Sequence, residues 1–284
     1  MSNIAPAQKP AEAPVLVIEA GRPESRYWKE LWQYRELLFY LTWRDITVRY
    51  KQTTIGVTWA ILRPLITMAV FTVIFGMLAR LPSEGVPYPI FVFAAMLPWQ
   101  FFSNGISEVG NSLVGNAGML SKVYFPRMIL PASALLTTFV DLLIAGVILA
   151  GLMFWYGYAP GWQIIALPAF VVLAMLFTLA LGVWFASLNV EYRDFRYIIP
   201  FVVQLGVYAS PVGYASSIVP DHWRLVYALN PMVGIIDGFR WSICAGRPEI
   251  YWPGLGISIA FTALLLISGM IYFRRMERTF ADVV

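Results

Sequence analysis

The sequence predicts an all-α integral membrane protein with six transmembrane helices, an N-terminal amphipathic interface helix and two short re-entrant helices before the last span. Three observations carry this prediction. The 284 residues are 59% hydrophobic and 13% charged, with a mean hydropathy of +0.68, which leaves little material for a water-soluble surface. The apolar residues gather in long segments. The basic residues between these segments are distributed asymmetrically.

Six apolar segments are the predicted spans. They cover residues 55–79, 89–110, 129–155, 163–188, 197–214 and 252–273. As a helix, the last of these extends roughly 33 Å at about 1.5 Å per residue, enough to cross about 30 Å of hydrocarbon. The helices of a soluble core do not need such lengths, so residues 53–278 are assigned to one membrane domain.

The basic residues predict the orientation of this domain. The chain has 20 Lys and Arg residues, and the predicted outer connections hold only four of them, Arg80, Arg224, Arg240 and Arg247. Because cytoplasmic loops retain Lys and Arg, both termini are expected to be cytoplasmic. The net charge of +4 then reflects topology and contact with anionic lipid headgroups, and no nucleic-acid partner is expected.

The ends of the chain flank this domain. Residues 1–23, rich in Pro and Ala, are predicted to form a flexible cytoplasmic tail, and residues 279–284 a cytoplasmic C-terminus. Residues 24–52 are predicted to form an amphipathic helix, whose apolar stripe consists of Trp28, Leu31, Trp32, Leu38, Phe39, Thr42, Trp43 and Ile46. This pattern is typical of a helix along the inner membrane surface. A soluble helix packed on a partner is a compatible alternative.

The last outer connection predicts two short helices. Asn230 followed by Pro231 is a helix-start signal, because Asn caps the first turn and Pro has the helical φ already set. A helix over residues 231–244 reaches only about 21 Å, which is too short to span. We therefore expect residues 222–229 and 231–244 to dip into the outer leaflet, with an ordinary outer loop as the alternative.

The chain lacks the residues of an enzyme site. Cys244 and His222 are single residues of their types, so neither an internal disulfide nor a His/Cys metal cluster is expected. No G-x-x-x-x-G-K-[ST] phosphate loop occurs, and no set of converging acids and bases is evident. Energy for any work must come from a partner or a gradient. No internal repeat supports an inverted-repeat carrier, and six spans favour a dimer.

Ionisable residues inside the spans are costly and therefore informative. Asp141 lies near the middle of the third span and Glu108 near the inner end of the second. A proton relay needs a chain of such groups, and these two are expected to stand apart, so a relay is not predicted. Asp141 is interpreted as a buried hydrogen-bond acceptor, neutral or paired, with a coupling-ion site as the alternative. Glu108 is close enough to the headgroups to reach them, or it acts as a helix cap.

Three further side chains have two interpretations each. Arg63, two turns into the first span, either reaches back to the inner interface or binds an anionic headgroup entering from the inner leaflet. Tyr208 and Tyr214 are either interface anchors or rings that line a path and present flat faces to sugars.

The connection between the second and third spans carries the strongest local signal. Residues 111–131 are first polar, then helical in pattern, and then stopped by Pro126 and Pro131. A short amphipathic helix here fits a groove on a soluble cytoplasmic partner. The alternative is a simple connector.

Three stretches resemble the permease subunits of polysaccharide-exporting ABC transporters, the Wzm, KpsM and TagG group, and most of all its O-antigen exporters. They are WRDITVRYKQTTIGVTWAILRPL at residues 43–65, NSLVGNAGMLSKVYFPRMILP at residues 111–131, and the pair Arg193-Asp194 followed by Pro200, Ser210-Pro211 and Asn230-Pro231. With the number and order of spans, the resemblance covers about residues 27–278. One departure is Arg63, where many relatives carry Gln.

The resemblance implies a homodimeric channel in the bacterial inner membrane, with an ABC nucleotide-binding subunit docked beneath each copy. ATP and Mg²⁺ would bind those partners, and no catalytic residue, metal or cofactor is expected in this chain. The implied residues coupling to the ATPase are Asn116, Met119, Leu120, Lys122, Tyr124 and Arg127. The implied cytoplasmic gate is Trp43, Arg44, Asp45, Arg49, Tyr50 and Lys51. The residues expected to line the substrate path or to bind the lipid headgroup are Trp59, Arg63, Tyr208, Ser210 and Tyr214. The implied outer gate consists of Trp223, Tyr227, Asn230, Pro231 and Phe239.

The leading hypothesis is therefore ATP-driven export of a polyprenyl-diphosphate-linked glycan, an O antigen first, across a membrane whose lipids are also partners. The same class of transporter with another cargo, such as capsule, teichoic acid or another lipid, is the alternative. A membrane-bound transferase acting on a polyprenyl-linked sugar belongs to a different class, and the missing acid/base constellation argues against it.

Overall fold

The computed structural model describes residues 24–51, 56–120, 122–192 and 194–277. Its regular elements are all helical in this part of the chain. The predicted tail, residues 279–284 and Arg193 lie outside the described residues. The helices are α1 (Glu24–Gln33), α2 (Arg35–Lys51), α3 (Gly56–Phe71), the π-helix η1 (Thr72–Leu78), α4 (Tyr88–Gly115), α5 (Ala117–Leu120), α6 (Ile129–Trp155), the 3-10 helix η2 (Trp162–Ala166), α7 (Leu167–Glu191), α8 (Phe195–Ala209), the 3-10 helix η3 (Ser216–Ile218), α9 (Asp221–Tyr227), α10 (Pro231–Ile243) and α11 (Trp252–Met276).

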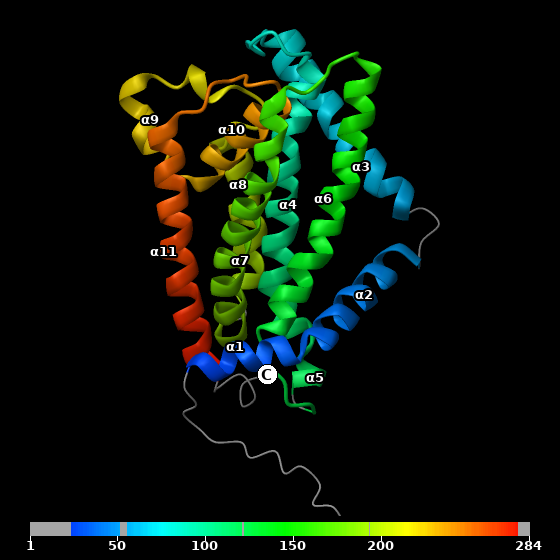
Figure 1. Ribbon diagram of the computed structural model, residues 1–284, viewed down its shortest axis with the longest axis vertical. Helices are drawn as coiled ribbons and strands as arrows, with labels where there is room; N and C mark the ends of the chain where they lie inside the picture. The colour runs from blue at the N-terminus through cyan, green and yellow to red at the C-terminus, as the bar shows by residue number, and fades with distance from the viewer. Residues whose placement is uncertain (1–23, 52–55, 121, 193, 278–284) are drawn as a thin grey trace, which may run out of the picture.

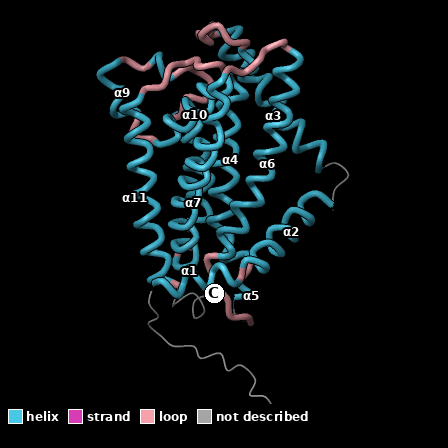
Figure 2. The backbone as a smooth tube through the Cα atoms, in the orientation of Figure 1, coloured by secondary structure: helices cyan, strands magenta, loops and turns pink. Residues whose placement is uncertain are grey.

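The long helices run side by side and give the molecule two ends (Figure 1). One end carries α1, α5 and the last turn of α11, and we call it the α5 end; the other carries α9, and we call it the α9 end. Figure 2 shows that the loops gather at these two ends, with helix between them. This arrangement satisfies the backbone N–H and C=O groups within each helix, as an apolar solvent requires.

Helix α4 is the centre of the bundle, and α3 with η1 lies at its edge. Of the apolar window in α4, 78% is buried, against 6% in the window that covers α3 and η1. Glycines allow the neighbouring helix α7 to approach α4 closely. A Cβ atom added to Gly105 would lie 2.5 Å from Thr178 Cγ2, and one added to Gly182 would lie 2.5 Å from Val109 Cγ1. Close packing of this kind leaves no space for a methyl group.

Among the described residues, five helical segments are long and apolar enough to cross a membrane. They are Ile61–Leu78, Tyr88–Gly115, Ile129–Trp155, Trp162–Glu191 and Trp252–Met276. They match five of the six predicted spans, and the third has the predicted limits. The predicted span over residues 197–214 is a 15-residue helix, α8, of about 22 Å. It ends at Ala209 because Ser210 has extended backbone angles, φ −117° and ψ 149°.

The predicted interface helix is divided in two. Helix α1 ends at Gln33 and α2 begins at Arg35. Only α1 segregates its polar and apolar residues strongly to opposite faces. Large rings are nevertheless exposed along both helices, with Trp32 70%, Phe39 71% and Trp43 62% exposed. The α2 residue Leu41 is buried in a cluster against α6, α7 and α11, so one side of α2 packs on the bundle.

Two helices occupy the last connection, where two short helices were predicted. Helix α9 covers Asp221–Tyr227 and α10 covers Pro231–Ile243. The Asn230 side chain caps α10 by accepting a hydrogen bond from Met232 N at 3.1 Å. Helix α10 packs among α4, α7 and α11, and most of its residues are buried. It is therefore an internal helix of the bundle at the α9 end.

Candidate functional site

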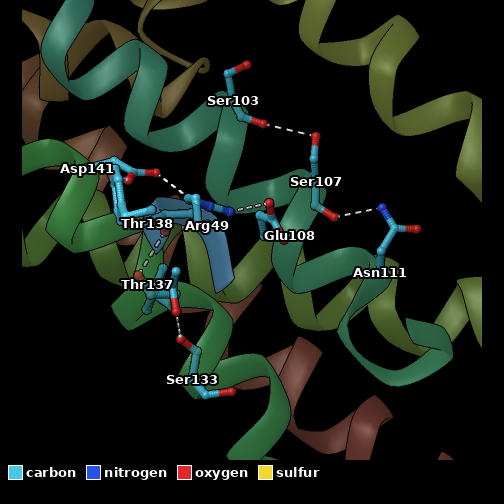
Figure 3. A network of polar contacts seen from close by, with 11 residues as sticks. Arg49, Ser103, Ser107, Glu108, Asn111, Ser133, Thr137, Thr138 and Asp141 are labelled. Atoms are coloured by element: carbon cyan, nitrogen blue, oxygen red, sulfur yellow. Dashed lines mark hydrogen bonds and ion pairs between the residues drawn. The ribbon is translucent and has the colours of Figure 1, made fainter. Parts of the chain in front are cut away.

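A network of charged and hydroxyl groups joins α2, α4 and α6 inside the bundle (Figure 3). Arg49 of α2 lies between two acids: Nη1 donates to Asp141 Oδ2 at 2.5 Å, and Nη2 donates to Glu108 Oε1. The Tyr50 hydroxyl donates to the second Asp141 oxygen, Oδ1. We call these four residues the Arg49 network. It gives each of the intramembrane acids a positive partner, which offsets part of the cost of placing a carboxylate there.

This network confirms one prediction and corrects another. Asp141 is a paired hydrogen-bond acceptor, as interpreted from the sequence. The inference that Asp141 and Glu108 stand apart is wrong, because the end of α2 places Arg49 between them. Sequence separation hid the contact, since Arg49 lies 92 residues from Asp141 and 59 from Glu108.

A polar stripe on α4 extends the network along the helix to both sides of Glu108. Ser103, Asn104, Ser107, Glu108 and Asn111 recur every three or four residues, so they share one face of the helix. This face is exposed or half-buried, although α4 is otherwise the most buried span. Ser107 Oγ donates to Ser103 O at 3.0 Å and Asn111 Nδ2 donates to Ser107 O at 2.7 Å (Figure 3). Sequence reasoning missed the stripe, although its spacing within an apolar span was a readable signal.

Helix α6 faces the stripe with a matching set of polar groups. Ser133, Thr137 and Asp141 lie four residues apart on one face. Between α2, α4 and α6 lies a cavity of about 480 Å³, which Arg44, Arg49, Glu108, Asn111, Ser112, Asn116, Ser133 and Thr137 help to line. Hydroxyl, amide and charged groups there can exchange hydrogen bonds with a polar solute. The arrangement is therefore suited to contact with a hydrophilic molecule inside an apolar bundle.

The implied gate and coupling residues meet at this cavity. Arg44 Nη2 donates to Asn116 Oδ1 at 3.2 Å, and Arg44 Nε donates to Asp45 Oδ1 at 2.8 Å. Asn116 follows α4 directly and precedes α5. Helix α2 is thus hydrogen-bonded to the loop of α5 at one point and ion-paired to α4 and α6 at another. Of the remaining residues of the implied gate, Trp43 and Lys51 are exposed.

The other implied coupling residues divide into a buried and an exposed group. Met119 and Leu120 pack in the cluster around Leu41. Lys122 and Tyr124 are exposed at the α5 end, and Tyr124 is 51% exposed. Arg127 N donates to Glu277 Oε1 at 3.0 Å and so ties this loop to the end of α11. Burial raises the pKa of the Glu277 carboxyl, and this hydrogen bond acts in the opposite direction.

The implied path residues do not converge. Arg63 is exposed on α3, Tyr208 is 71% exposed near the end of α8, and Ser210 is fully buried. The side chain of Trp59 lies outside the described residues. Ser210 belongs instead with the α9 end, because its Oγ accepts from Asn230 Nδ2 at 3.0 Å.

The implied outer-gate residues lie around α10. Asn230 Nδ2 also donates to Ala209 O at 3.3 Å, which links the start of α10 to the end of α8. The hydroxyls of Tyr214 and Tyr227 are 2.9 Å apart, and burial raises the pKa of Tyr227. Pro231 and Phe239 are buried, whereas Trp223 is 56% exposed.

Arg240 is a buried residue that sequence reasoning placed in an outer connection. Its guanidinium is fully buried and donates to the carbonyl oxygens of Phe91 at 3.2 Å, Val212 at 2.9 Å and Tyr214 at 2.7 Å. It also lies 3.7 Å from the centroid of the Phe91 ring. It therefore joins α4, α10 and the segment after α8, and it is a structural residue rather than a loop charge. The sequence signal for the burial of Arg240 was Asp237, an acid that lies one helical turn earlier within an apolar stripe.

Asp237 is the acidic neighbour of Arg240 on α10. It is 4% exposed. Burial raises the pKa of its carboxyl to about 6, while the neighbouring Ser216 hydroxyl and the Arg240 guanidinium act in the opposite direction. Desolvation thus outweighs the attraction of the charges around it.

These features define a helical membrane protein, because apolar helices of spanning length carry a charged and hydroxyl-bearing face. A family model described as ABC-2 type transporter matches residues 36–244. The chain belongs to this family of transporter membrane subunits.

Individual relatives agree with this membership. The chain is 30% identical, over 90% of its own length and 98% of the relative's, to the O-antigen export system permease protein RfbA of Myxococcus xanthus. It is 25% identical to the protein of the same name from Klebsiella pneumoniae, over 88% of this chain and 95% of the relative. The polysialic acid transport protein KpsM of Escherichia coli is 21% identical, over 82% of this chain and 91% of the relative.

Proposed function

We propose that this chain is the membrane subunit of an ATP-driven exporter that moves a lipid-linked polysaccharide, an O antigen first, from the cytoplasm to the periplasm across the inner membrane. The observation that supports this choice of cargo is the 30% identity, over almost the whole of both chains, to a relative named as an O-antigen export permease. ATP and Mg²⁺ bind a separate ABC nucleotide-binding subunit. The chain itself supplies the path and responds to the partner.

The proposed topology places the α5 end in the cytoplasm, with both termini on that side. The basic residues Lys122, Arg274 and Arg275 at this end support it. The sixth crossing is then made by α8 together with residues 210–214. Helices α9 and α10 dip into the outer leaflet from the periplasmic side.

The proposed channel is formed by two copies of the chain. Apolar residues are exposed along α3, as at Ile66 and Val70, and along α8, as at Phe201 and Leu205. In the proposed dimer these two helices of both copies line the path. The polar stripe of α4 contributes hydroxyls and amides to it, which suits a glycan better than an apolar lipid.

The proposed coupling route begins at α5. ATP binding draws the two nucleotide-binding subunits together, and they push on the exposed loop that contains Lys122 and Tyr124. The hydrogen bond from Arg44 to Asn116 transmits this movement to α2. The Arg49 network then transmits it to α4 and α6. Movement of α2 would thus change the cavity that lies between these helices.

Copurification tests the proposal. The tagged chain is extracted from its native membrane in mild detergent, and bound proteins are identified by mass spectrometry. We expect an ABC ATPase in equal amount, and ATP hydrolysis in the complex but not in the chain purified alone. Robust hydrolysis by the chain alone, or the absence of any ATPase from the complex, would contradict the proposal.

Capsular polysaccharide is the second candidate cargo. The relative named as a polysialic acid transport protein supports it, at lower identity. Deletion of the gene distinguishes the two cargoes, since loss of the O antigen and loss of the capsule are separately visible on gels of the surface polysaccharides.

A further inference from the structure

A second large cavity lies at the α9 end, apart from the Arg49 network and the proposed path. Its volume is about 990 Å³, and it is lined by residues of η2, η3, α9, α10, the first turn of α11 and the segment before α11, together with Glu84. No lining residue comes from α2, α3, α4, α6 or α8 among the described parts of these helices. The cavity is therefore separate from the helices that carry the Arg49 network and the proposed path.

Two residues that line this cavity each carry a buried side-chain oxygen without a hydrogen-bond donor in the part of the chain that the structure describes. These oxygens are Asp237 Oδ1 and Gln163 Oε1. Asp237 is a charged side chain that is 4% exposed, and it lies on the α10 side of the cavity. Gln163 lies on η2. A buried acceptor without a donor is unfavourable, so both atoms favour a ligand that brings donors.

The rest of the lining favours an uncharged polyol over an anion. Three acids, Glu84, Asp237 and Glu249, face two arginines, Arg224 and Arg247. Arg224 is already committed, because it pairs with Asp221 at 3.1 Å and donates to two backbone carbonyls. A phosphate or another anion would therefore meet an excess of negative charge.

Aromatic rings complete the cavity. Trp162 and Trp241 meet edge to face with centroids 6.0 Å apart, and Tyr227 and Tyr251 also line the space. Such rings offer flat apolar faces with polar tips. Sugars combine hydroxyl donors with apolar C–H faces, so their chemistry matches both the unpartnered oxygens and the rings.

We propose that this cavity binds a neutral oligosaccharide segment of about two to three sugar units, a size that fits the upper range of ligand pockets. The choice of a sugar rests on the proposed function, in which the cargo is a glycan and the α9 end faces the periplasm. Asp237 and Gln163 accept hydrogen bonds from sugar hydroxyls, and Trp241 packs against a ring face. The site holds glycan that has left the path.

Binding to the purified chain in lipid nanodiscs tests this assignment. The probes are oligosaccharides of one to three repeat units, released by mild acid from the surface polysaccharide of the source bacterium. Titration calorimetry measures affinity, and saturation-transfer NMR identifies the protons in contact. We expect saturable binding. Asp237→Asn and Gln163→Ala are each expected to weaken it about ten-fold or more, since each removes or replaces an acceptor.

Asp194→Asn is the matched control, because Asp194 is an exposed acid at the start of α8 that does not line the cavity. It is expected to bind as the wild type does.

Thermal melting shows whether each variant is folded, and Gln163→Ala tests the site even if Asp237→Asn does not fold. Absence of saturable binding to the wild type, or wild-type affinity in both cavity variants, would overturn the assignment. Copurification with an ATPase is independent of this result, so the two proposals fail separately.

Discussion

Two arginines illustrate what single residues contribute to this bundle. Arg240 donates to three backbone carbonyls that belong to α4 and to the segment after α8. Arg49 donates to one carboxylate on α4 and one on α6. The Arg240 side chain is fully buried, whereas the Arg49 side chain is 31% exposed. The planar guanidinium suits both roles, because its five N–H donors point in fixed directions.

The substitution Arg240→Met tests the first of these roles. It keeps the apolar bulk but leaves three buried carbonyl oxygens without their donor and removes the cation beside Asp237. We expect the free energy of unfolding to fall by about 3 to 5 kcal/mol, as for other broken buried pairs. Unfolding in mixed detergent micelles, followed by circular dichroism, measures the change.

Lys51→Met is the matched control for that experiment. Lys51 is an exposed cation at the end of α2. Its loss is expected to cost less than about 1 kcal/mol, as is usual for surface substitutions. Equal stability losses in the two variants would contradict a structural role specific to Arg240.

At the scale of helices, close contact between α4 and α7 depends on small residues. A Cβ atom at Gly182 would lie 2.5 Å from Val109 Cγ1 and 2.7 Å from Val109 Cβ, so rotating the Val109 side chain cannot relieve the clash. The two helices would have to separate.

The substitution Gly182→Ala is therefore expected to reduce stability by about 1 to 3 kcal/mol, the usual cost of overpacking. Gly146→Ala on α6 is the control, since nothing lies within 4 Å of the added atom. That change is expected to be neutral or to stabilise by up to about 1 kcal/mol, because Ala favours helix more than Gly does. Thermal melting of both variants in the same detergent measures the difference. Similar losses in the two would refute the packing argument.

The attachment of α2 to the bundle gives a second prediction at this scale. In Arg49→Ala, Glu108 and Asp141 lose their shared cation, and the end of α2 should detach more often. Backbone amides in the last turns of α2 are expected to exchange hydrogen about ten-fold faster or more, since hydrogen bonds to charged groups contribute roughly 1.5 to 3 kcal/mol. Hydrogen-exchange mass spectrometry measures this. The control is Lys51→Ala, which removes an exposed cation and should exchange hydrogen at the wild-type rate. Unchanged exchange in Arg49→Ala would show that the network does not hold α2.

Local patterns predicted the elements better than their ends or their partners. Helix α6 has the predicted limits, Ile129–Trp155, because the length of an apolar run is a local property. The predicted span over residues 197–214 was too long as a helix, because its apolar pattern continues past Ala209 into a turn. The Arg49 network was not predictable from spacing, since its members come from three helices far apart in the sequence. The α9-end cavity depends on tertiary packing in the same way.

At the scale of the whole molecule, the two ends differ in character. The α5 end presents a short helix and, beside it, an exposed lysine and an exposed tyrosine that lie outside the buried clusters. The α9 end is built from short helices around Arg240 and the large cavity. The first end is suited to a soluble partner and the second to control of the exit, and the polar groups of α2, α4 and α6 lie between them.

Docking of the partner gives the prediction for the α5 end. Tyr124→Ala removes an exposed ring at the loop that the nucleotide-binding subunit is proposed to grip, and aromatic residues are often binding hot spots. Copurified ATPase is expected to fall several-fold, while thermal stability stays within about 0.5 kcal/mol of the wild type. Tyr208→Ala changes a tyrosine that is even more exposed, 71% against 51% for Tyr124, and that lies near the C-terminal end of α8; it should retain the full amount. Full retention of ATPase by Tyr124→Ala would argue against docking at this loop.

Transport itself tests the central claim, that this chain is a conduit without its own energy source. Inverted inner-membrane vesicles containing the chain and its ATPase are loaded on the outside with radiolabelled polyprenyl-diphosphate-linked glycan, and the glycan protected inside from added glycosidase is measured. The account predicts protection that requires ATP and both proteins. Equal protection without ATP, or in vesicles that lack this chain, would contradict it.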